Sequence, residues 1–327
     1  MSAIRPLIGK IALVTGASRG IGKGIALQLG QAGATVYITG RKPEHSLLNK
    51  YSEFPTLEKT AEEVRMRDTT CHPVYCDHSN PDEIKSLFEK ISNENNGTLD
   101  ILVNSAYSAV NDMGEAGNKK FYECDPLFWD NCNNVGLRNN YICCTLAARM
   151  MVEKKSGLII NISSAGGLQY TMNVAYGVGK AGVDRLAADM AVELKGTNVS
   201  IVTVWPGPVS TEMFHRLEQD GKVQAMTKLP QEVLDSMLGA SESPEFTGKA
   251  IVALATDARI QKKTGRIFLT YDLAKEYGFK DLNGKLPMNM RSLSSALSFL
   301  GWTRLASFIP SFITVPTVFM HMASYKF

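Results

Sequence analysis

The chain has 327 residues, of which 44% are hydrophobic and 20% are charged, and its formal net charge is +3. This length and composition suffice for one large domain with a sizeable core or for two smaller ones. Because the positive charges form no basic block, nucleic acid is not an expected partner. The six cysteines fit no zinc spacing and no secreted disulfide framework, so we expect reduced thiols.

Two further classes are disfavoured by local patterns. The first twenty residues lack the long apolar core and the small-residue cleavage site of a signal peptide, so the chain is not expected to be secreted. Cys71, His72, Cys76 and His78 lie on an alternating run typical of a strand, whose successive side chains point to opposite faces. No metal site is predicted there.

Short apolar runs alternate with amphipathic stretches along the chain, a pattern typical of strand–helix–strand units. The predicted strands lie near residues 11–15, 35–39, 72–76, 100–104, 158–163, 199–204 and 266–270. The predicted helices lie near residues 20–32, 56–67, 81–95, 126–154, 174–195 and 244–256. This order predicts an α/β fold with a doubly wound (Rossmann-type) parallel sheet of about seven strands.

The predicted organisation is a single domain over residues 1–272 with a C-terminal extension over residues 273–327. Parallel sheets bind ligands outside the carboxyl ends of their strands. Three long connections follow strands at that edge, and long connections there are usually functional. They span residues 42–55, 107–125 and 206–243.

The first predicted strand runs into a glycine-rich turn, T-G-A-S-R-G-I-G at residues 15–22, and then into a helix. Gly16, Gly20 and Gly22 would allow the tight turn and a close approach of a pyrophosphate to the helix N-terminus. The alternative is a turn that binds no ligand.

The second predicted strand ends without the acidic residue that would bind a free ribose 2′-hydroxyl, and Arg41 follows instead. A guanidinium suits a 2′-phosphate, and Arg19 in the glycine turn could help, so NADP(H) is predicted over NAD(H). Two surface arginines are the alternative. Asp77 and Asn104 follow the third and fourth strands, where they would either orient an adenine and hold neighbouring loops or cap the next helix.

Tyr176 and Lys180 stand four residues apart in a predicted helix, so both side chains would lie on one face. A tyrosine titrates near pH 10, and a nearby ammonium would favour the phenolate and so permit proton transfer at neutral pH. Gly177 and Gly179 weaken this helix, and we expect them to make room for a flat ligand. For an isolated match, a buried tyrosine beside a surface lysine is the alternative.

The motifs T-G-x-x-x-G-x-G, D-x-S, N-S-A, I-S-S, Y-x-x-x-K and P-G-x-V-x-T occur in this order, and over residues 7–272 the chain resembles the single-domain branch of the short-chain dehydrogenase/reductase family. The resemblance implies an NAD(P)-dependent oxidoreductase that interconverts a carbonyl and an alcohol. Tyr176 would be the general acid, Lys180 would lower its pKa and hold the nicotinamide ribose, and Ser164 would bind the substrate oxygen. Family spacing favours Ser164 over Ser163, whose side chain would face the opposite way.

The resemblance also implies a set of cofactor contacts along the strand ends. They are Gly16, Ser18, Arg19, Gly20, Ile21, Gly22, Arg41, Asp77, Asn104, Tyr176, Lys180, Pro206, Val209 and Thr211.

One departure from the family pattern concerns Gly136, which aligns with an asparagine that supports a water relay to the lysine. Asn133, one turn earlier, is a candidate substitute. A nucleotide-binding scaffold that lacks efficient catalysis is therefore the alternative to a reductase. A sugar-nucleotide epimerase, which also uses Y-x-x-x-K, is disfavoured by the glycine spacing and by the short region after the sixth strand.

The segment after P-G-P-V-S-T-E-M is rich in apolar side chains and would cover the active site. It contains Met213, Phe214, Leu217, Met226, Leu229, Val233 and Leu234. Such a wall predicts a small hydrophobic substrate, a steroid- or lipid-like ketone or aldehyde or the corresponding alcohol. Packing of a helix onto the sheet is the alternative.

The apolar tail from about residue 292 contains no Asp, Glu, Lys or Arg between residues 305 and 325. Its length and its prolines predict an interfacial membrane anchor or a cover on a partner subunit rather than a regular membrane span. Five further stretches resemble one member of the family, which implies the cytosolic face of the endoplasmic reticulum, or otherwise the cytoplasm. The family also implies a homo-oligomer.

Overall fold

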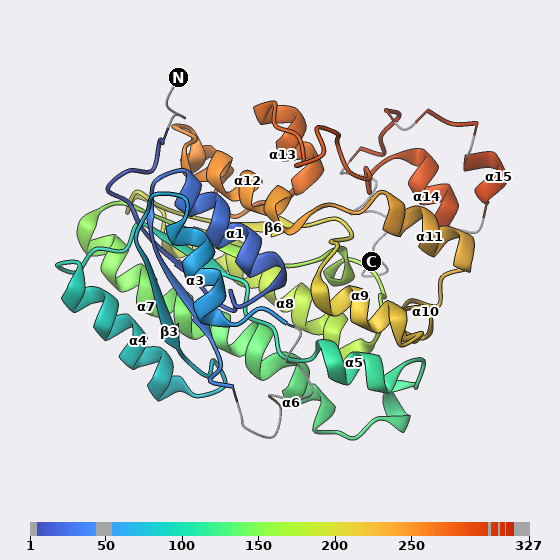
Figure 1. Cartoon of the computed structure of the whole chain (residues 1–327), viewed down its shortest axis with the longest axis horizontal. Helices are drawn as coiled ribbons and strands as arrows, with labels where there is room; N and C mark the ends of the chain where they lie inside the picture. The colour runs from blue at the N-terminus through green and yellow to red at the C-terminus, as the bar shows by residue number, and fades with distance from the viewer. Residues whose placement is uncertain (1–4, 44–53, 300–301, 307, 311, 317–327) are drawn as a thin grey trace.

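The seven predicted strands are all present in the computed structural model, which describes residues 5–43, 54–299, 302–306, 308–310 and 312–316 (Figure 1). The strands are β1 (Ile11–Val14), β2 (Thr35–Gly40), β3 (Cys71–Tyr75), β4 (Ile101–Asn104), β5 (Gly157–Ile162), β6 (Val199–Trp205) and β7 (Ile267–Leu269). They pair in parallel in the order β3-β2-β1-β4-β5-β6-β7. This order confirms the predicted doubly wound sheet in a single domain.

Both faces of the sheet are buried. In β1, Ala12 and Val14 belong to one hydrophobic cluster while Leu13, between them, belongs to the other. Because helices cover both faces, the strands read in the sequence as continuous apolar runs rather than as alternating patterns.

The helices fall close to the predicted positions, with additional short ones in the long connections. They are α1 (Gly20–Gln31), α3 (Leu57–Arg65), α4 (Pro81–Glu94), α5 (Val110–Ala116), α6 (Phe128–Asn133), α7 (Asn139–Lys154), α8 (Val174–Glu193), α9 (Glu212–Gln219), α10 (Lys222–Thr227), α11 (Gln231–Gly239), α12 (Pro244–Ala255), α13 (Thr270–Tyr277), α14 (Leu293–Phe299) and α15 (Thr303–Ala306). Buried side chains of α1, α3, α12 and α13 share one cluster. Those of α4, α7 and α8 share the cluster on the opposite face.

The single helix predicted over residues 126–154 is wrong, because the chain breaks it into two. Between α6 and α7, residues Asn134–Arg138 form a π-type turn. Within it Val135 and Gly136 have non-helical backbone angles, and the φ of Gly136 is 151°. The apolar periodicity on both sides does not reveal this break, because it depends on one backbone angle that glycine adopts without strain.

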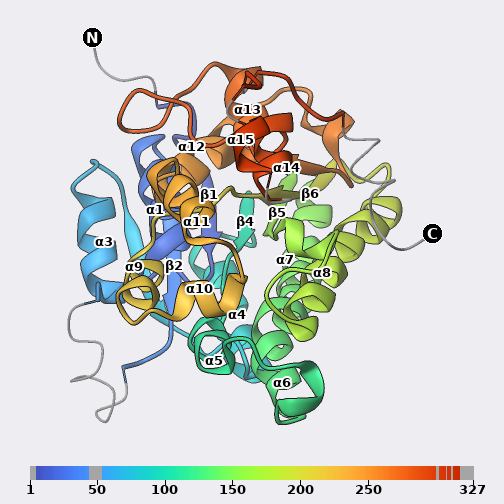
Figure 2. The same ribbon diagram turned by 90° about the vertical axis from the view of Figure 1, so that its right-hand side faces the viewer.

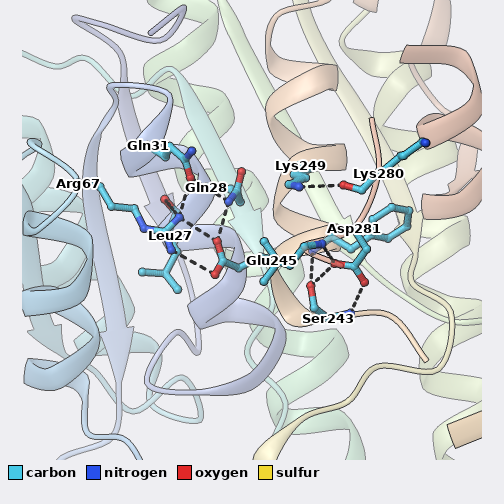
Figure 3. Close-up of polar contacts among 11 residues, drawn as sticks. Leu27, Gln28, Gln31, Arg67, Ser243, Glu245, Lys249, Lys280 and Asp281 are labelled. Carbon is cyan, nitrogen blue, oxygen red and sulfur yellow. Dashed lines mark hydrogen bonds and ion pairs between the residues drawn. The ribbon is translucent and has the colours of Figure 1, made fainter. Parts of the chain in front are cut away.

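Helices α1 and α12 pack with their backbones in close contact. A Cβ at Gly24 would lie 2.2 Å from the carbonyl of Pro244, so only glycine fits there. Figure 3 shows the polar seam beside this contact, where the carboxylate of Glu245 accepts hydrogen bonds from Gln28 (2.6 Å) and from both terminal nitrogens of Arg67 (2.8 and 3.1 Å). The seam joins α1, α12 and the end of α3.

The C-terminal extension begins inside the domain. Leu273 of α13 is fully buried in the core. Asp281 is also buried, and it accepts hydrogen bonds from the backbone N–H and the hydroxyl of Ser243, the residue that caps α12 (Figure 3). Lys249 adds a bond to the carbonyl of Lys280 (2.8 Å). The residues just after 272 are therefore fastened to the sheet domain.

The last described residues fold back on the start of the tail. The backbone N–H of Val315 donates to the carbonyl of Arg291 (2.7 Å), and the guanidinium of Arg291 donates to the carbonyl of Val315. No helix within the described part of the chain is long and apolar enough to cross a membrane. Residues 317–325 of the predicted apolar tail lie outside the described residues.

Candidate active site

The glycine-rich turn is fixed by its contacts with the end of β4. The hydroxyl of Thr15 accepts hydrogen bonds from the backbone N–H groups of Ser105 (3.0 Å) and Ala106 (3.1 Å). A Cβ at Gly16 would lie 2.5 Å from the Cα of Ala106. A Cβ at Gly22 would lie 2.3 Å from the carbonyl oxygen of Gly16. Side chains are excluded at both positions, so the turn keeps the bare backbone that a dinucleotide pyrophosphate requires.

The turn meets the segment after β6, although about 190 residues separate the two in the sequence. The backbone N–H of Gly20 donates to the carboxylate of Glu212 (2.9 Å). Thr211 caps α9, and its Cγ2 lies 3.4 Å from where a Cβ of Gly20 would stand. The structure thus brings the predicted cofactor residues Gly20 and Thr211 together, while Ile21 packs against the core.

The end of β2 lies beside the same turn. The Cβ of Ser18 would lie 3.4 Å from a Cβ at Gly40, and Arg41 follows Gly40 as an exposed residue. The guanidinium of Arg19 lies over the ring of Phe54 at 5.1 Å. Ser18 and Arg41 therefore both lie next to Gly40 at the carboxyl end of β2.

Asp77 and Asn104 both make hydrogen bonds within the protein. Asp77 accepts a hydrogen bond from the backbone N–H of Ser79 (2.8 Å), a turn that leads into α4. Asn104 is 1% exposed, and its amide donates to Asn161 of β5 (2.9 Å) and to the sulfur of Cys144 (3.2 Å). Asn104 therefore joins two strands inside the sheet rather than facing the ligand edge.

Pro206 and Val209 belong to a segment that is fastened to the buried carboxylate of Glu242. Val209 pairs with Glu242 through the backbone. The carboxylate accepts hydrogen bonds from the N–H of Gly207 (3.2 Å) and from the hydroxyls of Thr270 (2.6 Å) and Thr247 (2.7 Å). Burial raises the pKa of Glu242 to about 7, and these hydrogen bonds only partly oppose that rise.

Tyr176, Lys180 and Ser164 meet at the N-terminal end of α8. The helix begins there because the side chain of Asn173 caps the backbone N–H of Tyr176 (2.8 Å). The ammonium of Lys180 donates to the carbonyl of Ile162 at the end of β5 (3.3 Å). The structure therefore places both side chains of the Y-x-x-x-K motif at the carboxyl end of the central strands.

The two serines after β5 bond different groups of α8. Ser163 donates to the backbone carbonyl of Lys180 (3.2 Å) and so supports α8. Ser164 accepts from the N–H of Gly166 (3.1 Å) and hydrogen-bonds the phenol of Tyr176. Ser164 is thus the serine beside the phenol of Tyr176.

The predicted lowering of the tyrosine pKa is wrong for this structure. Burial raises the pKa of Tyr176, Asp184 raises it further, and only the hydrogen bond from Ser164 lowers it. Lys180 is itself buried, which lowers its pKa to about 8 against the attraction of Asp184. Its amine is therefore only partly charged above neutral pH and stabilises a phenolate weakly.

The predicted role of Gly179 is also wrong. A Cβ at this position would lie 2.2 Å from the side-chain oxygen of Asn133, so the glycine makes room for α6 rather than for a ligand. A Cβ at Gly177 would approach the carbonyl oxygen of Gly166 to 3.2 Å. Both glycines serve the packing of neighbouring segments against α8.

Asn133 links two helices of the site. Its amide donates to the backbone carbonyls of Trp129 (3.2 Å) and Ala175 (3.3 Å), and so joins α6 to the start of α8. Both backbone groups of Gly136 make hydrogen bonds. The N–H donates to the side chain of Asn139 (2.6 Å), and the carbonyl accepts from the side chain of Asn140 (3.0 Å). The carbonyl at this position is therefore already bonded within the chain.

Four residues of the site were missed from the sequence: Tyr107, Asp184, Glu212 and Glu242. Asp184 lies one further helical turn beyond Lys180, so the spacing Y-x-x-x-K-x-x-x-D is a signal that could have identified it. Tyr107 directly follows N-S-A at the end of β4, as the first residue of the second long connection. No local sequence pattern marks Glu212 or Glu242, because most of their hydrogen-bond partners lie far away in the sequence.

Helices α9, α10 and α11 close over this site together with α5, and Figure 2 shows α10 beside α5. A third hydrophobic cluster contains Tyr176 and apolar side chains from these helices, with methionine as its commonest member. The buried methionines are Met113, Met213, Met226 and Met237. Most of the predicted apolar wall thus belongs to the same cluster as Tyr176.

Within the described part of the chain, no group of three or more His, Cys, Asp or Glu side chains could hold a metal ion. The six cysteines are free thiols, and burial raises the pKa of Cys71 and Cys76 to about 12.

A glycine-rich turn at the first strand, a Y-x-x-x-K pair beside a serine and a seven-stranded parallel sheet define a dinucleotide-dependent oxidoreductase. The family model for short chain dehydrogenases matches residues 10–222. The chain therefore belongs to the short-chain dehydrogenase/reductase family.

Known proteins of this family resemble the chain over much or nearly all of its length. It is 45% identical to dehydrogenase/reductase SDR family member 1 of Mus musculus, over 99% of this chain and 100% of that protein. The Homo sapiens protein of the same name is also 45% identical, over 98% of this chain and 99% of that protein. The NADPH-dependent aldehyde reductase 2 of Arabidopsis thaliana chloroplasts is 33% identical over 64% of this chain and 75% of that protein.

A crystal structure of a metagenomic short-chain oxidoreductase in complex with NADP superimposes with a TM-score of 0.59 at 26% identity. It covers 80% of this chain and 97% of that one. The chain is thus an oxidoreductase built on a nucleotide-binding fold.

Proposed function

We propose that this oxidoreductase uses NADP(H) rather than NAD(H) and reduces hydrophobic ketones or aldehydes of the steroid or lipid kind, or oxidises the corresponding alcohols. The exposed Arg41 after β2, next to Gly40, supports the cofactor preference, because a guanidinium binds a 2′-phosphate and position 41 carries no carboxylate for a 2′-hydroxyl. The Arabidopsis relative is named as an NADPH-dependent aldehyde reductase, which agrees with NADP(H) as the cofactor and with a carbonyl substrate.

The contact between Tyr176 and the methionine-rich cluster is the observation that carries the substrate class. Methionine side chains adapt to apolar molecules of different shape, and a substrate bound at the tyrosine would replace these contacts. The cofactor would supply the hydride. Tyr176 would donate its proton to the carbonyl oxygen, and Ser164, already bonded to the phenol, would donate to the same oxygen as charge develops.

The test is to follow NADPH and NADH consumption over a panel of apolar and small polar aldehydes and ketones. We expect turnover with NADPH and bulky apolar compounds, and a loss of at least about 100-fold in kcat/KM in Tyr176→Phe. Tyr170→Phe is the matched control, because Tyr170 is 60% exposed. Equal rates with NADH, or a preference for small polar compounds, would contradict the proposal.

A second candidate is a nucleotide-binding scaffold without efficient catalysis. It is favoured by Gly136, which lacks the side chain of the family asparagine and whose carbonyl already accepts a hydrogen bond from Asn140. Tight NADPH binding without turnover of any compound in the panel would support the scaffold and reject the reductase.

We also infer that the extension places the enzyme at the cytosolic face of the endoplasmic reticulum membrane. Trp302, Phe308 and Phe312 are 59%, 83% and 78% exposed, as expected of side chains that enter a lipid interface. Replacing all three by serine should move the protein from the membrane fraction to the soluble fraction of cells. An unchanged distribution would contradict this placement.

We also propose that the protein forms a homo-oligomer through α8. Val174, Val178 and Val192 on this helix are 43%, 47% and 73% exposed. Light scattering should give a mass at least twice that of one chain for the wild type, and a smaller one for Val178→Glu. A monomeric wild type would contradict it.

A further inference from the structure

Tyr107 stands beside the amine of Lys180, although it belongs to none of the motifs described above. The Nζ of Lys180 lies 5.0 Å from the centre of the Tyr107 ring and 5.8 Å from that of Tyr176. The two rings meet edge to face, with their centres 6.0 Å apart and their planes at 78°. The amine is therefore in contact range of two aromatic rings, at distances typical of a cation–π interaction.

The position of Tyr107 is fixed at both ends of its side chain. The backbone just before it is held, because the N–H of Ala106 donates to the hydroxyl of Thr15 (3.1 Å). Its own hydroxyl donates to the sulfur of Met113 (3.7 Å) and is hydrogen-bonded to Cys132 of α6. The ring is thus held between the β4 end, α5 and α6.

Gly136 provides the space for this ring. A Cβ at Gly136 would lie 2.7 Å from Cδ2 and 2.9 Å from Cε2 of Tyr107, so a side chain at 136 and the ring at 107 exclude each other. The φ of 151° also disfavours any residue with a Cβ. Asn139 and Asn140 hold the backbone of Gly136 on both sides, so the bulge cannot move away from the ring.

We propose that Tyr107 is a positioning residue for Lys180: its ring holds the amine against the carbonyl of Ile162 and keeps water from it, in the space that Gly136 leaves open. The inference deepens the proposed function, on which it rests, and it assigns the support of the lysine to a phenol ring in a chain where Gly136 replaces the family asparagine.

The charges around Lys180 determine what loss of the ring would do. Asp184 on α8 is the charged group that acts on the amine, and it raises the pKa of Lys180, whereas burial lowers it to about 8. The titratable groups beside it are Tyr176 on α8 and Tyr107, with Cys132 of α6 beyond the latter. Loss of the ring would remove its cation–π contact with the amine, which favours the charged form, but it would also let water reach Nζ while Asp184 stayed in place. Because burial is the largest cause of the lowered pKa, the pKa of Lys180 would rise toward its ordinary value.

The experiment is competitive labelling of the full-length protein with trace acetic anhydride between pH 6 and 11, with the label on Lys180 quantified by peptide mass spectrometry. We expect the midpoint of labelling to lie near pH 8 in the wild type and in Tyr107→Phe, which keeps the ring. In Tyr107→Ala the midpoint should move up by at least about one pH unit. Tyr170→Ala, which removes an exposed ring beside Lys228 (5.8 Å), is the matched control and should leave Lys180 unchanged.

Equal midpoints in the wild type, Tyr107→Phe and Tyr107→Ala would overturn the proposal. If Tyr107→Ala does not fold, as judged by its thermal unfolding, Tyr107→Val gives the same test with a smaller cavity. Since labelling needs no substrate, a shifted midpoint supports the positioning role even where no carbonyl compound is reduced. Where turnover is measurable, kcat should fall about tenfold or more in Tyr107→Ala and less than twofold in Tyr107→Phe, while the KM for NADPH changes less.

Discussion

The glycine turn before α1 and the bulge between α6 and α7 each depend on a glycine with positive φ, but they use their backbone groups differently. At Gly20 the N–H is bonded by Glu212, a side chain from a distant segment. At Gly136 the N–H and the carbonyl are bonded by Asn139 and Asn140, three and four residues along the chain. The first bond can be exchanged for one to a ligand, whereas the second pair is part of the local fold.

The largest effect expected from this comparison is on stability, with alanine placed at each glycine. Gly136→Ala combines backbone strain with a clash against Tyr107, and should reduce the free energy of unfolding by about 3 kcal/mol. Gly20→Ala should lose only about 1 kcal/mol, because a Cβ there has no neighbour closer than 3.4 Å. Urea unfolding of both variants measures the difference. Equal losses would mean that the bulge is no more rigid than the turn.

A second prediction concerns Glu242, which holds Gly207 and Val209 in the segment just before Glu212. Burial raises the pKa of Glu242 to about 7 in the folded state, so the stability that its protonated form contributes is complete below pH 4.5 and is lost as the pH rises through 7. The lost part is about 3 kcal/mol between pH 4.5 and pH 8. Glu242→Gln should therefore be more stable relative to the wild type at pH 8 than at pH 5.

Urea unfolding at the two pH values measures this change, and Glu232→Gln on the exposed surface of α11 is the control. If the difference between Glu242→Gln and the wild type is the same at both pH values, the carboxyl titrates normally in the folded protein.

The smallest predicted effect concerns the exchangeable bond itself. A carboxylate on the N–H of Gly20 competes with a cofactor phosphate for the positive end of α1, an effect of about 0.3 to 1 kcal/mol. Glu212→Gln should therefore bind NADPH about two- to fivefold more tightly in a fluorescence titration. Glu232→Gln again serves as the control. Weaker binding would show that Glu212 supports the turn instead of competing for it.

The strands and most helices could be predicted because apolar periodicity and turn residues are local signals. The break at Gly136 could not, because the apolar periodicity on both sides does not reveal it and only a backbone angle marks it. The placement of Gly179 against Asn133 and of Glu212 against Gly20 depends on segments that meet only in the folded chain. The pKa of Tyr176 was misjudged for a related reason, since burial, which depends on the whole fold, is the largest cause of the pKa shifts of both Tyr176 and Lys180.

The close contact between α1 and α12 has a consequence for the synthesis of the chain. More than 200 residues separate the end of α1 from the start of α12, so a ribosome needs roughly 10 to 40 s to reach the partner of α1. During that time the face of α1 that will meet α12 is uncovered. Where α1 meets Pro244 and Gly248, its face consists of Gly24 and Gln28, so this part of α1 exposes no large apolar side chain while the nascent chain waits for its last helices.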